Sequence, residues 1–456
     1  MLKGGLAMRL LIKFRNTVMY MLKMLTVVTY VTAFIAVWQS FYHQASFSGR
    51  GNYLVVFTYV AVLLVFVSIY DAFKVGIMRV HELIYSMSLS LAFTNFFVYF
   101  ELCLVARGML NPLPILLLMV AQILIVAVFT QSLNHSYFAL YKARSVLAIF
   151  SVENKSDIIK KMAAIKERFA LSKGITADKG LDAIKKEIKK YETVLICDFD
   201  ATLKAEVLKY CYSKNKRIYL LPSSADTILN GSYPVQIFDT PVLFLHNGGL
   251  SMEQRIIKRT MDIILSLFGI VITSPIMLVI ALAIKLTDGG PIIFKQVRVT
   301  RNQKLFNIYK FRSMKVQSED EVKLTTIDDD RVTKVGKLIR PLRLDELPQL
   351  FNILFGHMSV VGPRPEMKEV VESNVDAVPE FNLRHKVKAG LTGYAQIYGK
   401  YNTTPQNKLN MDLFYIEHYS VLEDIKLIIM TVKILFVRES TEGFSEKDSK
   451  VKNCDN

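Results

Sequence analysis

The chain has 456 residues, of which 52% are hydrophobic, and its mean hydropathy is +0.29. It is too long for one ordinary domain and too apolar for a purely soluble protein, so membrane segments are expected. The net charge of +17 at pH 7 suits nucleic acid, anionic lipid or a phosphorylated substrate. The four cysteines follow neither a CxxC nor a Cys/His spacing, so the pattern indicates neither a structural zinc site nor a disulfide framework.

Four apolar runs fill the first third of the chain, and each approaches the ~20 residues that a helix needs to cross the hydrocarbon core. They lie at about residues 19–38, 53–70, 83–106 and 113–130. Lys23, inside the first run, lies near a helix end, where it can snorkel to the interface. Basic residues favour the cytoplasmic side, and they flank alternate ends of the runs: Lys3, Arg9, Lys13, Arg15, Lys74, Arg79, Lys142 and Arg144. The N-terminus and the chain after residue 141 are therefore predicted to be cytoplasmic.

Residues 142–250 alternate short apolar runs with charged helical patterns, which is typical of a Rossmann-like α/β domain. The predicted buried parallel strands are "SVLAIFSV", "TVLICDF" and "RIYLLP", and the predicted covering helices are "KSDIIKKMAAIKERFAL" and "ATLKAEVLKYCYSK". The first strand-to-helix turn, "SVENKSD", has none of the glycines that let a backbone approach a pyrophosphate. Dinucleotide binding is therefore not expected in this domain.

An apolar run then extends from about Ile263 to Ile284. Its length and periodicity alone favour an ordinary fifth span with a proline kink. Charge favours a different path, because basic residues flank both ends: Lys258, Arg259 and Lys285. Pro275 removes a helix hydrogen bond at the centre, and the hydroxyl of Ser274 can satisfy a freed carbonyl. These two residues offer a means of turning back inside one leaflet.

The last third contains three further recognisable segments. "PIIFKQVRVTRNQKLFNIYKFRSM" is predicted to be a β-hairpin, and "YSVLEDIKLIIMTVKILF" is predicted to be a helix at the membrane interface or in the core. The acidic triplet at residues 328–330 is interpreted as a solvated turn rather than a cation site. The polar tail from about Arg438 is predicted to be disordered.

The stretch "RLDELPQLFNILFGHMSVVGPRPE" places two adjacent carboxylates, Asp345 and Glu346, before a proline. Its leucine spacing predicts a helix that begins near Asp345, with Pro348 in the first turn. Such a terminus favours negative charge and phosphate, although an ordinary capping pair fits the same pattern. Cations in the surrounding sequence suit phosphate oxygens: Lys310, Arg312, Arg340, Arg343 and Arg364. One carboxylate can attack phosphorus while its neighbour holds Mg²⁺ against the phosphates.

Six stretches in this order resemble the bacterial sugar transferase family, the monotopic phosphoglycosyl transferases that act on polyprenol phosphate. They are "KRTMDIILSLFGIVITSP", "GGPIIFKQVRV", "FNIYKFRSM", "LDELPQLFNILFGHMSVVGPRPE", "GLTGYAQIYGK" and "DIKLIIMTVKILF". The preceding spans and middle domain look like the large form of these enzymes, found in capsule, exopolysaccharide and O-antigen initiation. The implied architecture is a four-helix transmembrane region at 1–141, a Rossmann-like α/β domain at 142–250, an α+β monotopic catalytic domain at 251–436 and a polar tail at 437–456.

The resemblance implies a two-step reaction. Asp345 attacks the β-phosphorus of a UDP-sugar, releases UMP and carries the phosphosugar until undecaprenyl phosphate accepts it. Glu346 would hold Mg²⁺, and the phosphate-binding cations would be Lys310, Arg312, Arg340 and Arg364. Ser274 and Pro275 match the break of the family's re-entrant membrane helix, here at about residues 262–285, in place of a fifth span. The resemblance also implies the bacterial inner membrane, a catalytic domain on the cytoplasmic face, a homodimer and downstream glycosyltransferases as partners.

Three positions depart from the usual family pattern. His357 stands where aspartate is usual, Thr300 where the hairpin turn often has glycine, and Arg343 where a small hydroxyl residue is often found. None of them removes a proposed catalytic group, and they bear on loop geometry and donor preference. His357 is interpreted as a loop or capping residue rather than a general base.

Two other functions remain as alternatives. A membrane-anchored nucleotide-sugar dehydratase or dehydrogenase would also join spans to a Rossmann domain, but it requires the glycine-rich turn that is missing here. A scaffold that recruits polysaccharide machinery without turnover would not need the set formed by Lys310, Asp345, Glu346 and Arg364. Nucleic acid is not an expected partner, because the basic residues lie beside acidic and apolar ones with no reader module.

Overall fold

The computed structural model of the chain describes residues 14–47, 50–151, 157–163, 165–245, 248–314, 332–399 and 403–435. The acidic triplet at residues 328–330 and the tail from residue 438, which the sequence analysis singles out, lie outside the described residues. The chain divides into two units, Met1–Leu221 and Pro222–Asn456. The four-part division inferred from the sequence stays a prediction.

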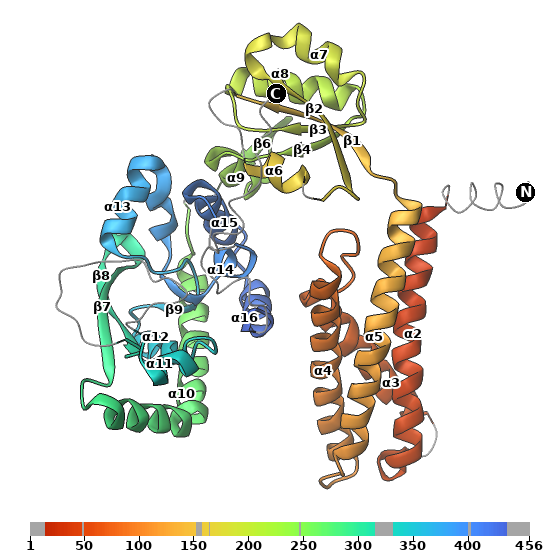
Figure 1. The fold of residues 1–456 in the computed structure, drawn as a ribbon, viewed down its shortest axis with the longest axis vertical. Coiled ribbons are helices and arrows are strands. Elements are labelled where there is room, and N and C mark those ends of the chain that lie inside the picture. Colours follow the sequence, from red (N-terminus) through yellow and green to blue (C-terminus); the bar gives the residue numbers. More distant parts are fainter. Residues whose placement is uncertain are drawn as a thin grey trace, which may run out of the picture. The chain divides into compact units, whose positions relative to one another are not determined.

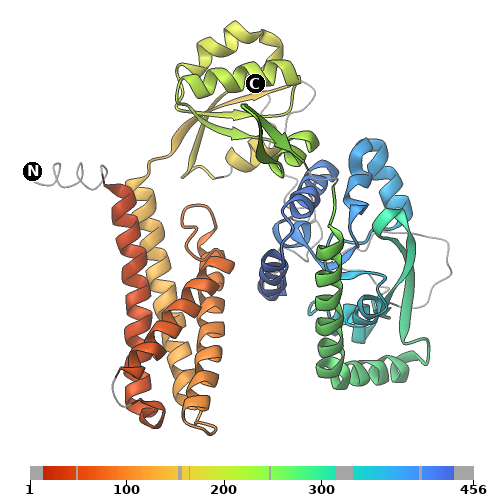
Figure 2. The same ribbon diagram turned by 180° about the vertical axis from the view of Figure 1, so that it is seen from behind.

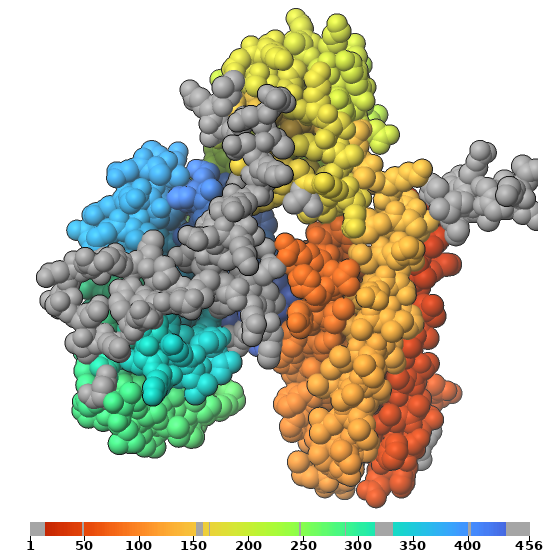
Figure 3. Space-filling model, viewed as in Figure 1, coloured from red at the N-terminus to blue at the C-terminus, as the bar shows by residue number. Residues whose placement is uncertain are grey.

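Four long apolar helices begin the first unit (Figure 1). They are α2 (Arg15–Phe41), α3 (Gly51–Ile69), α4 (Val80–Val105) and α5 (Leu113–Leu140), with a 3₁₀ turn, η1 (His43–Ala45), after the first. Figure 3 shows α2 and α5 side by side along the bundle. All four helices are long and apolar enough to cross a membrane, in agreement with the four predicted spans.

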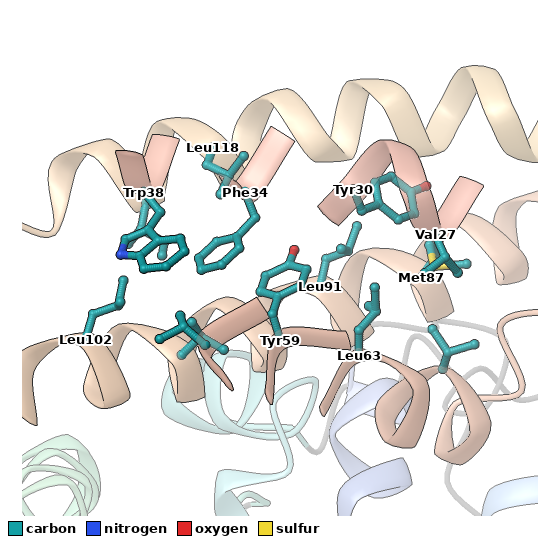
Figure 4. Packing of buried hydrophobic residues seen from close by; sticks show 14 of the residues in the cluster. Val27, Tyr30, Phe34, Trp38, Tyr59, Leu63, Met87, Leu91, Leu102 and Leu118 are labelled. Atoms are coloured by element: carbon teal, nitrogen blue, oxygen red, sulfur yellow. The ribbon is translucent and has the colours of Figure 1, made fainter. Parts of the chain in front are cut away.

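The interior of this bundle combines stacked aromatic rings with a small polar network. The ring of Phe34 stacks on that of Tyr59 at 4.2 Å between centroids (Figure 4). Beside them, Gln122 donates to the Tyr59 hydroxyl at 2.9 Å and accepts from Asn95 at 2.8 Å. These buried polar groups satisfy one another across α3, α4 and α5, so they favour one pairing of the helices.

A four-stranded parallel sheet completes the first unit. Its order is β2 (Phe169–Thr176), β1 (Arg144–Phe150), β3 (Thr193–Ile196) and β4 (Arg217–Leu220), joined through α6 (Asp157–Ala163), η2 (Ala177–Lys179), α7 (Leu181–Ile188) and α8 (Ala201–Ser213). The central strand β1 is buried on both faces, as parallel sheets covered by helices require. The predicted parallel α/β sheet is therefore confirmed.

One predicted helix of this domain is partly wrong. The sequence analysis extends a helix through "KERFAL", but α6 ends at Ala163 and the chain from Phe169 forms the edge strand β2. Phe169 is buried and pairs with Arg144 of β1. Pairing with β1 outweighs the local helical pattern, because tertiary burial overrides weak propensity.

The second unit begins with α9 (Ser224–Asn230) and an antiparallel hairpin, β5 (Tyr233–Ile237) and β6 (Thr240–Phe244). The sequence analysis places this segment in the middle domain and does not predict the hairpin. Next come α10 (Met252–Asp288) and a second hairpin, β7 (Ile293–Val299), η3 (Arg301–Gln303) and β8 (Leu305–Phe311). In this second hairpin Phe294 faces Lys310 across the antiparallel pair, which confirms the prediction for "PIIFKQVRV" and "FNIYKF".

Short elements then alternate up to residue 435. They are α11 (Lys334–Ile339), η4 (Leu344–Glu346), α12 (Gln349–Leu354), β9 (Ser359–Val361), α13 (Lys368–Ala377), η5 (Pro379–Lys386), β10 (Gly390–Thr392), α14 (Tyr394–Tyr398), α15 (Pro405–Glu417) and α16 (Val421–Leu435). Strands β9 and β10 pair in parallel. The helix predicted for "YSVLEDIKLIIMTVKILF" is confirmed as α16.

The helix α10 is bent into two arms (Figures 1 and 2). Pro275 lies inside it and has no amide hydrogen to donate to the carbonyl four residues earlier, that of Val271. The hydroxyl of Ser274 donates to this carbonyl at 2.8 Å. The bend therefore leaves no orphaned carbonyl at Val271, which is the compensation that the sequence analysis proposes for Ser274.

Each arm of α10 is fastened to the second unit in its own way. The first arm carries Lys258, which is buried and pairs with Asp424 of α16 at 2.6 Å. It also carries Asp262, which accepts from the Ser359 hydroxyl and the Val360 amide at 2.9 Å each. The second arm packs through apolar side chains that share one core with β8, α11 and η4: Met277, Ile280, Ile284, Phe311, Ile339 and Leu344. The second arm thus supports the turn that carries the acidic pair.

Candidate active site

The acidic pair lies in the 3₁₀ turn η4, not at the start of an α-helix as predicted. Helix α12 begins only at Gln349. Pro348 cannot donate to the carbonyl of Leu344, so the chain closes the turn with i to i+3 bonds. The amide of Glu346 donates to Arg343 at 3.1 Å, and that of Leu347 donates to Leu344 at 3.3 Å. The proline that the sequence analysis places in the first turn therefore separates the acids from the helix.

Arg343 precedes the acids in the left-handed region, with φ 53° and ψ 23°. A non-glycine residue there costs on the order of 1 kcal/mol or more and persists only where its surroundings hold it. Its guanidinium is largely buried and contributes positive charge near Glu346. The sequence analysis notes Arg343 as a departure from the family pattern, and the structure places it at the corner that reverses the chain before Asp345.

Glu346 meets cations from two distant segments. The Lys310 ammonium, from β8, lies 2.8 Å from its carboxylate oxygen, and the Arg364 guanidinium, from the loop after β9, lies 3.7 Å from the same oxygen. The Glu346 side chain is only 12% exposed. A hairpin strand, a 3₁₀ turn and a proline-bounded loop therefore converge on one carboxylate, and the charge-assisted contacts hold it in place.

The two carboxylates titrate in opposite directions. Burial alone would raise the pKa of Glu346, but Lys310 and Arg364 outweigh it and lower that pKa to about 2. Burial raises the pKa of Asp345, with the negative charge of Glu346 acting in the same direction and Lys310 and Arg340 acting against it. Glu346 therefore stays ionised, while Asp345 is the weaker acid of the pair.

The loop that presents Arg364 is held by a half-buried arginine and a fully buried one, neither of which the sequence analysis identifies. Arg298 donates to the Pro365 carbonyl at 3.3 Å, and Arg384 donates to the Arg364 carbonyl at 3.2 Å. Arg384 is fully buried and pairs with Asp412 at 2.8 Å. Both arginines lie outside the motif that contains the acids, so the motif itself does not point to them. The one local signal is for Arg298, a basic residue between two valines in the strand segment "VRV".

A glycine completes this anchorage. A Cβ on Gly390 of β10 would lie 2.1 Å from the Gly362 amide nitrogen and 2.5 Å from the Thr392 carbonyl. Only a glycine permits that approach of backbone to backbone. The glycine-containing stretch "AGLTG" is therefore needed to seat the loop that carries Arg364.

The remaining predicted site residues lie in different surroundings. Arg340 acts on Asp345, whose pKa it lowers. Arg312 is buried with its guanidinium against Gly290, where a Cβ would approach it to 2.4 Å. Ser274 and Pro275 lie at the bend of α10 and contribute no group to the charged cluster. The roles assigned to all these residues stay predictions.

Two of the departures from the family pattern contact each other. The Thr300 hydroxyl donates to the His357 carbonyl at 3.2 Å and accepts from the Ala389 amide at 3.1 Å. The His357 ring lies near those of Phe306 and Phe355. Thr300 thus links the β7–β8 hairpin to the loop after α12 and to the segment before β10.

The donor set at the acids matches what Mg²⁺ takes from proteins. Mg²⁺ is commonly held by one or two carboxylates together with substrate phosphates and water, rather than by a cage of protein ligands. Asp345 and Glu346 offer two adjacent carboxylates, and Glu346 is ionised. Within the described ranges no cluster of three or more His, Cys, Asp or Glu groups could hold a metal alone. A metal here would therefore depend on the phosphates of a bound substrate.

Comparison with known proteins identifies the family to which the region around the acidic pair is similar. The sequence profile of the bacterial sugar transferase family matches residues 253–438. An exopolysaccharide production protein of Rhizobium leguminosarum bv. phaseoli is 38% identical over 198 residues, which cover 97% of that protein and 41% of this chain. The chain belongs to the bacterial sugar transferase family. Both acids and all the cations discussed above lie within the family match.

Two longer relatives also match part of this sugar transferase. A UDP-glucose:undecaprenyl-phosphate glucose-1-phosphate transferase of Klebsiella pneumoniae is 44% identical over 218 residues, 46% of this chain and 45% of that protein. A UDP-N-acetylgalactosamine-undecaprenyl-phosphate N-acetylgalactosaminephosphotransferase of Aeromonas hydrophila is 42% identical over 183 residues, 39% and 43% of the two chains. The chain thus spans less than half the length of these relatives.

Replacing Arg384 with methionine is expected to destabilise the sugar transferase domain. The change leaves Asp412 and Glu366 buried without their guanidinium, and breaking a buried ion pair from one side costs about 3–5 kcal/mol. Chemical unfolding of the detergent-solubilised protein measures this. The control is Lys368→Met, which breaks a surface pair with Glu372 and should cost less than about 1 kcal/mol. Equal losses in the two variants would contradict the anchoring role of Arg384.

Proposed function

We propose that this sugar transferase moves a sugar 1-phosphate from a UDP-sugar to undecaprenyl phosphate and so starts a surface polysaccharide repeat unit. The observation that carries the proposal is the convergence of Lys310, Glu346 and Arg364 around the turn that holds Asp345. The names of the relatives from Klebsiella and Aeromonas support the same class of reaction. They differ in the sugar they name, so the donor is left open here.

In the first step, a carboxylate oxygen of Asp345 attacks the β-phosphorus of the UDP-sugar. The bond between the β-phosphorus and the bridging oxygen breaks, and UMP leaves with the bonding electrons. In the second step, a phosphate oxygen of undecaprenyl phosphate attacks the same phosphorus. The aspartyl–phosphorus bond breaks and restores the carboxylate. The lipid diphosphate sugar is the product.

The neighbouring groups serve charge and orientation. Lys310, Arg340 and Arg364 would bind the diphosphate oxygens, and their fixed positions would stabilise charge that develops during transfer. Arg312 is also predicted to bind phosphate. Because it is buried beside Gly290, a substrate phosphate would have to reach it there. Glu346, which stays ionised, would hold Mg²⁺ against the substrate phosphates. When bound, the metal would neutralise phosphate charge and assist the departure of UMP.

We also propose that α10 enters and leaves the bilayer on the cytoplasmic face of the inner membrane. The bend at Pro275 and the cations at both ends support this re-entrant path over a fifth span. Many apolar side chains of both arms are exposed, such as Phe268, Val271 and Leu282. The acid-bearing turn packs on the second arm, so this path would bring the reaction to the surface where the lipid phosphate lies.

Asp345→Asn is expected to lower UMP release from the donor sugar by at least about a thousand-fold, because no carboxylate remains to attack phosphorus. The assay uses purified full-length protein with Mg²⁺, undecaprenyl phosphate and a panel that includes UDP-glucose and UDP-N-acetylgalactosamine. Asp376→Asn, an exposed acid of α13, is the matched control and should retain wild-type turnover. Without the lipid acceptor, the wild type alone should gain the mass of one phosphosugar.

Normal turnover by Asp345→Asn would contradict the nucleophile assignment. Absence of UMP release from every donor, with folded protein and lipid acceptor verified, would contradict the proposed transferase activity and favour the scaffold alternative.

The pH dependence of UMP release should report the raised pKa of Asp345. Attack requires the ionised form, so the rate should rise with pH through a midpoint above the ordinary aspartate value of about 4. Lys310→Met removes a cation that lowers this pKa, so the midpoint should move to higher pH in the residual activity. Lys337→Met, an exposed cation of α11, should leave the midpoint unchanged. A downward shift in Lys310→Met would contradict this account.

The path of α10 can be tested by labelling single cysteines in a background without native cysteines. Arg255→Cys and Thr287→Cys lie near the two ends of the helix. Both should react with a membrane-impermeant maleimide in inside-out vesicles and be protected in right-side-out vesicles. Met109→Cys, in a loop predicted to face outward, should show the opposite pattern. Labelling of Arg255→Cys and Thr287→Cys from opposite sides would establish an ordinary fifth span.

A further inference from the structure

A cavity of about 240 Å³ lies at the end of the four-helix bundle where α2 begins and α5 ends. It is far from the acidic pair in sequence. Helix α2, the loop between α3 and α4, and the end of α5 form its walls. Its lining includes Asn16, Tyr20, Lys23, Val75, Tyr137 and Tyr141. The proposed transferase chemistry uses none of these residues.

Lys23 is the unusual member of this lining. It lies inside a span, is half-buried, and its ammonium sits 5.8 Å from the centre of the Phe73 ring. In the described part of the chain, no carboxylate lies within ion-pair distance of Lys23, and Asp71, two residues before Phe73, pairs with Lys74 at 2.9 Å. A cation in a membrane segment is costly and is usually retained for a partner. The described residues supply an aromatic face here, but no carboxylate within ion-pair distance.

The cavity is shaped by close packing of the loop against α5. Gly76 has φ +75°, and a Cβ at this position would lie 2.0 Å from the Tyr137 ring. The loop therefore approaches α5 only because residue 76 is glycine. On the other side, the Tyr141 hydroxyl donates to the Asn16 side chain, and Arg15 stacks on the Tyr141 ring at 4.9 Å.

The chemistry of the walls selects an anion attached to an apolar tail. Lys23, the Asn16 side-chain amide and the Tyr20 hydroxyl are donors suited to phosphate oxygens. The residues beside Lys23 on α2 are apolar and exposed, namely Met21, Met24 and Leu25, which suits acyl chains. Basic pockets between membrane helices are known binding places for anionic lipid headgroups. Lys23 lies eight residues into α2, or ~12 Å along the helix axis, which is within reach of a headgroup.

We propose that this cavity binds the phosphate headgroup of an anionic membrane phospholipid, with Lys23 as its principal cation. The exposed apolar residues beside Lys23 favour a lipid over free phosphate. The bound lipid would supply the counter-charge that the described residues do not provide at Lys23, and it would link α2, α5 and the loop between α3 and α4. This site is independent of the proposed transferase reaction.

Native mass spectrometry of the full chain in detergent tests the proposal. Dioleoyl phosphatidylglycerol is titrated against the wild type, and dioleoyl phosphatidylcholine serves as the zwitterionic comparison. The wild type should hold one phosphatidylglycerol more tightly than phosphatidylcholine. Lys23→Met should weaken that binding about ten-fold or more, the loss expected for a charged hydrogen bond. Lys142→Met, an exposed cation just after α5, should change it by less than about two-fold, and Lys23→Arg should retain it.

Equal binding of the two lipids by the wild type would overturn the proposal, and this comparison decides even where Lys23→Met fails to fold. Unchanged phosphatidylglycerol binding in a folded Lys23→Met protein would also overturn it. Displacement of the lipid by an equal concentration of inorganic phosphate would identify a site for the free ion and reject the lipid assignment. UMP release does not enter this test, so failure of the transferase proposal would leave its result unaffected.

Discussion

A proline in the middle of an apolar helix is the constraint on which the candidate site depends. Pro275 leaves the carbonyl of Val271 without its helical donor, and Ser274 supplies the missing hydrogen bond. The helix can therefore bend without an orphaned polar group in an apolar setting. One arm is tied into the domain by buried ionic and hydrogen-bonding groups, and the other lies beneath the turn that carries the acids. The position of the acid-bearing turn therefore depends on the bend in α10.

The second requirement is to hold several positive charges close together around Glu346 in spite of their mutual repulsion. Lys310, Arg343 and Arg364 all act on Glu346, whose ionisation they stabilise. The loop bearing Arg364 would be repelled by its cationic neighbours if it were free. Arg298 and Arg384 fix it through its backbone carbonyls, and Glu366 and Asp412 neutralise Arg384. Structural ion pairs and candidate catalytic groups therefore share one network, with the structural ones more deeply buried.

Two adjacent acids of similar intrinsic pKa acquire opposite pKa shifts from their surroundings. Lys310 and Arg364 lower the pKa of Glu346, which stays ionised. Burial and the negative charge of Glu346 raise the pKa of Asp345. Opposite shifts in neighbouring groups are the expected mark of a division between nucleophile and electrostatic ligand. The 3₁₀ turn and the left-handed Arg343 make this asymmetry possible, because an ordinary helix start would present both acids to the same dipole.

The sequence by itself determined the features that depend on composition and local pattern. Apolar run length predicted the four spans, alternation predicted the parallel strands and the β7–β8 hairpin, and the ordered motifs indicated the family. Tertiary structure alone decided which distant cations meet Glu346 and that Arg298 and Arg384 hold the loop of Arg364. It also decided that Phe169, predicted to be helical, lies in the edge strand β2, and that the two acids lie in a 3₁₀ turn. The physical reason is that pairing, burial and ion-pair geometry depend on residues far apart in the chain, and a local period carries no record of them.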